Sequence, residues 1–301
     1  MSPKTDDRDG AGAERFVFTA STGRCGEASL TEVLRRHAPL VYPGFEEPQV
    51  RPMLPSILGT AERHFRRRWV ETDALLGRGE TLRAAARGDT AFLERIAARR
   101  LQMARARMRR SGARVYFDIS KFFVRGLHLG FARLLPRFDI VLLVRDPVVN
   151  MRSYLNRHKA FAKDSLLPSD RSNLLCMTDS DLAPGELYLW AWFETYLRYL
   201  ALCEDARVSR SATLRTEHLS DPARVEAFLT ALDLPHEPVG RVPPQNTNVT
   251  AGHGPTHVSD DDRRLFERFL SRVPAHVVDR IGYLDGYVPA GAGASQAGAA
   301  A

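Results

Sequence analysis

Short apolar segments that alternate with helical segments constrain the fold of this chain more than any other feature. The pattern predicts five strands, at 15–21, 40–45, 114–120, 139–146 and 212–219, and helices at 28–37, 147–159, 186–206 and 222–231. The fourth strand contains the continuously apolar run IVLLV, which is typical of a parallel strand buried on both faces. The alternation predicts an α/β fold, a three-layer α/β/α arrangement of P-loop-like type with a mainly parallel central sheet. Ligands are then expected at the carboxyl ends of the strands.

The length of 301 residues is sufficient for one large domain. We predict that this domain spans 14–288 and that it contains an Arg-rich helical insertion at 55–113. The segments 1–13 and 289–301 are rich in small or polar residues without apolar periodicity, and we expect both to be disordered tails.

Three observations bear on the compartment. No apolar run approaches the ~20 residues of a membrane span, and the first residues lack the apolar core of a signal peptide. The three cysteines, Cys25, Cys176 and Cys203, are irregularly spaced, which disfavours a disulfide framework or a zinc site. We therefore expect a cytoplasmic protein without a membrane span.

Positive charge is concentrated in one segment. Residues 61–114 contain 15 arginines and six acidic residues, a local net charge of +9. An apolar stripe at helical spacing predicts a helix packed on the sheet with a solvated basic face; it consists of Leu93, Ala97, Leu101, Ala104 and Met108. Binding of an anionic acceptor, a protein partner or a nucleic acid is the alternative. A nucleic-acid-binding module would rest on charge alone, because no helix-turn-helix, zinc-finger or aromatic RNA-binding motif accompanies the charge, and we expect no nucleic-acid partner.

The segment FTASTGRCGEASL (18–30) predicts a strand, a loop with Gly23 and Gly26, and a helix that begins near Glu27. This is the position of a phosphate-binding cradle in strand–loop–helix units. The nucleotide signature G-x-x-x-x-G-K-[ST] is absent, because Glu27 and Ala28 follow Gly26, and Arg24 is the strong cation of the loop.

A second motif is RDPVVNMRS (145–153). Arg145 ends a buried strand, Pro147 is expected at the first helical position, and Ser153 lies two turns into the helix. A guanidinium at a strand end can bind a phosphate bidentately, and a hydroxyl near the positive end of the helix can contact the same group. An ion pair between Arg145 and Asp146 is the alternative interpretation.

Together, TGRCGEASL and VLLVRDPVVNMRSYLNR resemble the two cofactor motifs of sulfotransferases of bacterial type that use 3′-phosphoadenosine 5′-phosphosulfate (PAPS). The resemblance implies that the loop holds the 5′-phosphosulfate through Gly23, Arg24, Cys25, Gly26 and Ser29. It also implies that Arg145 and Ser153 hold the 3′-phosphate. In this loop Cys25, Glu27 and Ala28 replace small hydroxyl residues that are usual in the family. Glu27 would repel an anionic cofactor unless its carboxylate points away.

Three further segments are similar to parts of that family. VYPGFEEPQVRPML (41–54) is similar to a segment of tyrosylprotein sulfotransferases that supplies a catalytic glutamate, here Glu47. FDISKFF (117–123) resembles the motif whose lysine meets the transferring group, here Lys121, and 214–235 is similar to the closing segment of the family. The implied activity is in-line sulfuryl transfer by Glu47, Lys121 and Arg24 without a metal. The acceptor hydroxyl would belong to a small molecule, carbohydrate, lipid or peptide, and the oligomeric state is not readable.

Other assignments stay open. Glu46 or Asp118 could be the base instead of Glu47. Asp118 could also be a metal ligand in a nucleotide-dependent kinase or NTPase, which the missing Lys-Ser/Thr pair after Gly26 disfavours. We interpret His128 as a core or helix-surface histidine. We interpret Trp190 and Trp192 as core anchors of a long helix. The polar loop 245–259 is a candidate lid over the cofactor.

Overall fold

The computed structural model describes residues 14–45, 61, 65, 80–156, 168–177, 182–240, 256–285 and 287. These residues form a five-stranded sheet in the order β2-β3-β1-β4-β5 in which all four strand pairs are parallel. The strands are β1 (Arg15–Ala20), β2 (Val41–Phe45), β3 (Val115–Ile119), β4 (Phe138–Val144) and β5 (Val208–Arg215). The predicted α/β fold with a parallel central sheet is therefore confirmed.

Burial follows strand position in the sheet. Every residue of β3 and β4 is buried, as expected for central strands with helices on both faces. The edge strand β5 is instead alternately exposed and half-buried along most of its length. We predicted this strand at 212–219, which is four residues too late: Thr216–Ser220 form a 3₁₀ turn, η3. The weak apolar character of an edge strand and the apolar Leu219 in the turn account for the error.

The helices of the structure are α1 (Glu27–His37), α4 (Thr81–Ala86), α5 (Thr90–Ser111), α6 (His128–Phe131), α7 (Pro147–Leu155), α8 (Pro184–Cys203), α9 (Pro222–Ala231), α10 (Asp260–Leu270) and α11 (Ala275–Val278), with the irregular turn η1 (Phe123–Leu127) before α6. The four helices predicted at 28–37, 147–159, 186–206 and 222–231 are present to within a few residues where the structure describes them, whereas α6, α10 and α11 were not predicted. The helix that we predicted at 147–159 ends at Leu155, and 157–167 lie outside the described residues.

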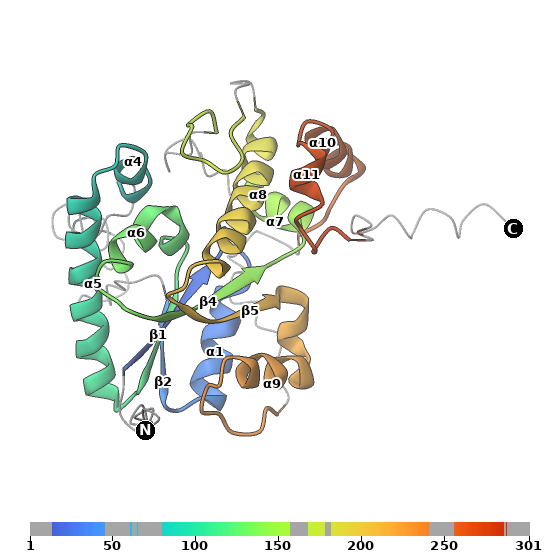
Figure 1. The fold of residues 1–301 in the computed structure, drawn as a ribbon. Coiled ribbons are helices and arrows are strands. Elements are labelled where there is room, and N and C mark those ends of the chain that lie inside the picture. Colours follow the sequence, from blue (N-terminus) through green and yellow to red (C-terminus); the bar gives the residue numbers. More distant parts are fainter. Residues whose placement is uncertain are drawn as a thin grey trace, which may run out of the picture.

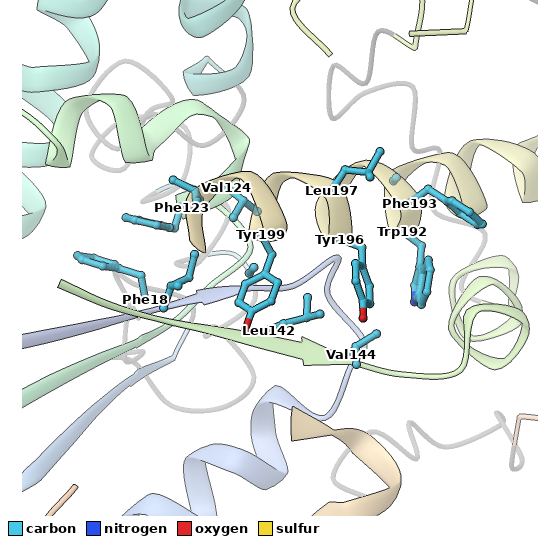
Figure 2. Packing of buried hydrophobic residues seen from close by; sticks show 14 of the residues in the cluster. Phe18, Phe123, Val124, Leu142, Val144, Trp192, Phe193, Tyr196, Leu197 and Tyr199 are labelled. Atoms are coloured by element: carbon cyan, nitrogen blue, oxygen red, sulfur yellow. The ribbon is translucent and has the colours of Figure 1, made fainter. Parts of the chain in front are cut away.

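Each face of the sheet is covered by its own apolar cluster. One joins the sheet to α1 and α9, and the other joins it to α5, α7 and α8 (Figure 1). In the second cluster, Trp192, Tyr196 and Tyr199 of α8 point towards Leu142 and Val144 of β4 (Figure 2). Trp190 and Trp192 are buried, which confirms their interpretation as core anchors.

The described part of the predicted Arg-rich insertion consists of α4 and α5. Its predicted apolar stripe is buried throughout, so α5 packs on the sheet as expected. Asp89 caps the helix by accepting a hydrogen bond from the Phe92 amide, and Gly112 ends it at a φ of 71°. Among the residues that the structure describes, no helix combines the length and the apolar character needed to cross a membrane.

Candidate anion-binding site

The carboxyl ends of β1 and β4 lie side by side in the centre of the sheet, since Ala20 of β1 is in register with Leu142 of β4. From here the chain leaves towards opposite faces. The helix after β1, α1, belongs to one apolar cluster, whereas the helix after β4, α7, belongs to the other. Such a switch point leaves a crevice between the two connections, and it is where parallel α/β sheets bind ligands.

The connection between β1 and α1, residues 21–26, is a tight loop with three left-handed backbone positions. Gly23, Arg24 and Gly26 have φ values of 91°, 64° and 90°. A Cβ atom at Gly23 would clash with the Tyr154 hydroxyl, and one at Gly26 would lie 2.7 Å from Cδ1 of Leu219. Glycine is therefore required at both positions by backbone conformation and by space.

Side chains of α7 hold this loop from one side. Asn150 is completely buried and donates to the Gly23 carbonyl over 3.0 Å, while its Oδ1 accepts from the Thr22 hydroxyl over 3.3 Å. Tyr154, one turn further along, donates to the Thr22 carbonyl over 2.5 Å. The loop conformation thus depends on tertiary hydrogen bonds from α7.

On the other side, η3 closes against the loop. The Thr216 hydroxyl lies 2.7 Å from the Cys25 carbonyl and 3.1 Å from the Val144 carbonyl, so it links the β1 loop to the end of β4. The N-cap residue of α1 is Gly26, which has no side chain to cap the first turn. The first backbone N–H groups of a helix are anion donors at its positive end.

The structure brings the predicted cofactor residues of the two motifs together. Nε of Arg24 donates to Oγ of Ser153 over 3.3 Å, and Nη1 of Arg145 lies 3.4 Å from the Arg24 carbonyl. These contacts link positions that are 129 and 121 residues apart in the chain. Two guanidinium groups and one hydroxyl thus converge on the crevice between β1 and β4, a donor set suited to a phosphate or sulfate group.

The backbone around Arg145 is held from both sides. The Trp192 indole donates to the Arg145 carbonyl over 2.9 Å. Asp146 caps α7 by accepting from the Val149 amide over 2.9 Å and also accepts from the Tyr287 hydroxyl over 2.6 Å. Among the described residues, no ion pair joins Arg145 to Asp146, so the carboxylate acts as a helix cap and leaves the guanidinium to the crevice.

Lys121 follows β3 and reaches the same loop. A Cβ atom at Gly23 would lie 3.7 Å from Cδ of Lys121, so the lysine stem passes directly over the loop. Its Nζ lies 5.9 Å from the centre of the Phe122 ring. The predicted catalytic lysine and the predicted phosphosulfate loop are therefore neighbours.

Cys25 and Glu27 occupy the interior of the loop. The Glu27 carboxylate accepts from the Ser21 hydroxyl over 2.6 Å and from the Cys25 amide over 3.0 Å. The Cys25 thiol is buried and accepts from the Asn150 amide group over 3.3 Å. Burial and the nearby Glu27 carboxylate raise the pKa of the thiol to about 12, so it is neutral at physiological pH. Ser29 lies half-buried in the first turn of α1.

The structure does not describe the candidate base. Glu46 and Glu47 lie outside the described residues. Most of the candidate lid 245–259 and both predicted tails also lie outside them. β2 ends at Phe45 on the carboxyl edge of the sheet, two residues before Glu47. The assignment of Glu47 as base stays a prediction.

Asp118 lines a pocket between α5 and the sheet together with Arg100 and Phe18. Burial raises the pKa of this carboxyl even though Arg100 opposes the shift. In the described part of the chain, no group of three or more His, Cys, Asp or Glu residues is arranged to hold a metal ion. The His128 ring lies 3.3 Å from the Phe123 carbonyl through Nδ1, and burial lowers its pKa to about 4, in line with its interpretation as a structural histidine.

Sequence reasoning missed Asn150, Tyr154 and Thr216. A signal for the first two was present: Asp146, Asn150 and Tyr154 recur every four residues, which places them on one face of α7. No sequence pattern marks Thr216. Its two carbonyl contacts depend on the position of η3, which no local pattern specifies.

No protein-family model matches this chain, and no curated protein sequence matches it. Its structure is similar to a solved structure described as "Sulfotransferase Domain from the Curacin Biosynthetic Pathway", with a TM-score of 0.49 and 14% identity over 92% of this chain and 99% of that chain. It is also similar to the "Sulfotransferase Domain from the Synechococcus PCC 7002 Olefin Synthase", with a TM-score of 0.43 and 15% identity over 88% and 98% of the two chains.

Proposed function

We propose that this protein is a PAPS-dependent sulfotransferase that transfers a sulfuryl group to an acceptor hydroxyl. The proposal rests above all on one observation. Arg24 of the β1 loop is hydrogen-bonded to Ser153 of α7, with Arg145 beside the Arg24 carbonyl, at the switch point of a parallel sheet. The residues that the family resemblance assigns to the two ends of the cofactor are thus contact neighbours.

The donor set fits an adenosine nucleotide with phosphate or sulfate groups at both ends. Arg145 and Ser153 would hold the 3′-phosphate near the positive end of α7. Arg24, Lys121 and the first amides of α1 would hold the 5′ end. Arg24 already contacts Ser153, so one guanidinium can serve both ends of the ligand. A triphosphate with Mg²⁺ fits less well, because Glu27 stands where the lysine of an NTP-binding loop would be.

The bound cofactor would supply a sulfuryl group whose sulfur would bond to the acceptor oxygen as its bond to the 5′-phosphate oxygen breaks, with the electron pair left on that oxygen. Lys121 and Arg24 would stabilise the growing negative charge there. Glu47 would accept the proton of the acceptor hydroxyl, a role worth about 10²–10⁴ in rate. Such a reaction requires no metal ion.

We place the enzyme in the reducing cytoplasm, because its three cysteines are free thiols. The acceptor is a hydroxyl of a small molecule, carbohydrate, lipid or peptide, and nucleic acid is not the proposed partner.

The test of the cofactor is a thermal-unfolding titration with 3′,5′-ADP, the desulfated product of PAPS, in parallel with ATP and Mg²⁺. A ligand at about 100 times its Kd adds ~2.7 kcal/mol to stability, which raises the midpoint by several degrees. We expect a shift with 3′,5′-ADP that is lost in Arg145→Ala. It should persist in Arg264→Ala, which removes an arginine from an exposed ion pair on α10. A shift with ATP and Mg²⁺ alone would overturn the proposal in favour of a kinase or NTPase.

The test of the base compares three conservative variants. Glu47→Gln should leave 3′,5′-ADP binding unchanged and reduce PAPS turnover by about 10²–10⁴. Glu46→Gln and Asp118→Asn should retain turnover within a few-fold. Turnover is measured as 3′,5′-ADP release in the presence of a panel of phenols, alcohols and sugars. Full turnover in Glu47→Gln, with loss in one of the other two, would move the role of base to that residue.

A further inference from the structure

The carboxylate of Glu27 is turned into the anion-binding loop. Glu27 is the first residue of α1. One of its oxygens accepts from the Ser21 hydroxyl over 2.6 Å, and the other accepts from the Cys25 amide over 3.0 Å. Ser21 in turn accepts from the Gly23 amide over 2.9 Å. The loop is therefore folded around an anion of its own chain.

This arrangement reduces the number of backbone amides that the loop can donate to a ligand. The Cys25 amide is already hydrogen-bonded to Glu27, and the Gly23 amide is already hydrogen-bonded to Ser21. Loops that cradle polyphosphates use such successive backbone amides as ligand donors. On the loop side the ligand would instead meet the side chains of Arg24 and Lys121 and the first turn of α1, whose N-cap residue is Gly26. They suit one terminal anionic group better than a chain of phosphates.

The negative charge of Glu27 also disfavours the binding of polyphosphates. A carboxylate at the loop repels an incoming anion, and the repulsion grows with the charge that the ligand brings to the site. The same carboxylate contributes, after burial, to the raised pKa of the neighbouring Cys25 thiol. The guanidinium groups of Arg24 and Arg145 lie at the same loop. A highly charged ligand would meet the Glu27 carboxylate as well as these cations, so the repulsion counts most against it.

We infer that Glu27 is a specificity-determining residue that makes the loop select ligands with a single, weakly charged terminal group and reject polyphosphates. This inference deepens the proposed function, on which it rests for the identity of the full ligand. It explains how a loop in the position of a nucleotide triphosphate cradle would admit a phosphosulfate and exclude ATP.

The test measures the affinities of inorganic sulfate and of tripolyphosphate without divalent cations, by thermal unfolding of the full chain. The quantity of interest is the ratio of the two Kd values. Glu27→Gln and Glu27→Thr both remove the charge, and each should shift the ratio about tenfold or more in favour of tripolyphosphate. Ser21→Ala keeps the charge and removes one hydrogen bond, so it should retain the wild-type ratio within about threefold.

The matched control is Glu32→Gln, on the same helix, where the carboxylate pairs with Arg36 at the surface. It should leave the ratio unchanged. If both Glu27 variants keep the wild-type ratio, or if Ser21→Ala shifts it as much as they do, the inference is overturned and Glu27 is a structural cap of the loop. Titration of the same variants with 3′,5′-ADP separates the two proposals. Absence of 3′,5′-ADP binding in the wild type and in every variant refutes the PAPS assignment, while the ratio still decides the role of Glu27.

Discussion

Two strand-to-helix connections meet at this site, and they are built in opposite ways. The connection from β4 to α7 consists of Arg145 and Asp146 alone and has a side-chain cap and a proline at the start of the helix. The connection from β1 to α1 has six residues, three left-handed positions and no side-chain cap. The first obeys local rules of helix initiation. The second keeps its shape through contacts from α7 and η3.

From this difference we infer separate roles for the two connections. A two-residue connection with its own helix cap, held in addition by Trp192 and Tyr287, keeps a permanent charge in one place, which suits binding of a phosphate by Arg145. A loop held by side chains from other elements can be adjusted by them, and it lies beside Lys121, the residue that we propose acts on the transferring group. Substitutions on the β4 side should therefore affect binding, and substitutions on the β1 side should affect rate or loop geometry.

The largest effect is expected from Lys121→Ala. Loss of one cation that stabilises charge in the transition state costs about 10²–10³ in kcat. The Kd of 3′,5′-ADP should rise less than in Arg145→Ala, because Arg24 and the first amides of α1 would still hold the 5′-phosphate. Rate is measured as sulfate release from PAPS with water as acceptor, so that the identity of the acceptor does not enter.

Lys121→Arg serves as the companion variant, because it keeps the charge but changes the shape of the head group. We expect it to recover part of the rate lost in Lys121→Ala. The two connections do not have separate roles if Lys121→Ala weakens 3′,5′-ADP binding as much as Arg145→Ala does and leaves the rate per bound cofactor unchanged.

The same contrast explains what could be predicted from the sequence. The apolar run of β4 and Pro147 at the first position of α7 are local patterns, and the structure agrees with both. The convergence of Arg24, Arg145 and Ser153 was implied by the family resemblance and by the rule that parallel strands end at one edge. The inward turn of Glu27 was not predicted, because the direction of its side chain depends on Ser21 and on the loop conformation. The base Glu47 stays a prediction from resemblance.

The second effect in size is expected from Asn150→Ala, which tests whether α7 holds the loop. The substitution removes the shortest of three contacts to the half-buried Gly23 carbonyl, which also accepts from the Thr22 hydroxyl and the Cys25 thiol, and it removes one contact of the Thr22 hydroxyl. A hydrogen bond contributes about 0.5–1.5 kcal/mol, so the loss of these two contacts should cost about 1–3 kcal/mol of stability. The control is Asn156→Ala at the end of the same helix, which should cost less than ~0.5 kcal/mol. Chemical unfolding gives the loss of stability in both variants. Equal losses would show that the loop keeps its conformation without the contacts from Asn150.

The smallest effect is expected from Asp146→Ala, which tests whether the β4 connection is fixed locally. The variant loses the cap on the Val149 amide and the contact with Tyr287, at a cost of about 1 kcal/mol. Asp221→Ala removes a cap of the same kind from α9, far from Arg145 in the sequence, and should cost about as much. The two variants should differ little in 3′,5′-ADP affinity, within about threefold, because Trp192 still holds the Arg145 carbonyl and Thr216 still holds that of Val144. A loss of tenfold or more in Asp146→Ala alone would mean that the cap also positions Arg145. The position of Arg145 would then depend on its own helix cap more than on Trp192 and Thr216.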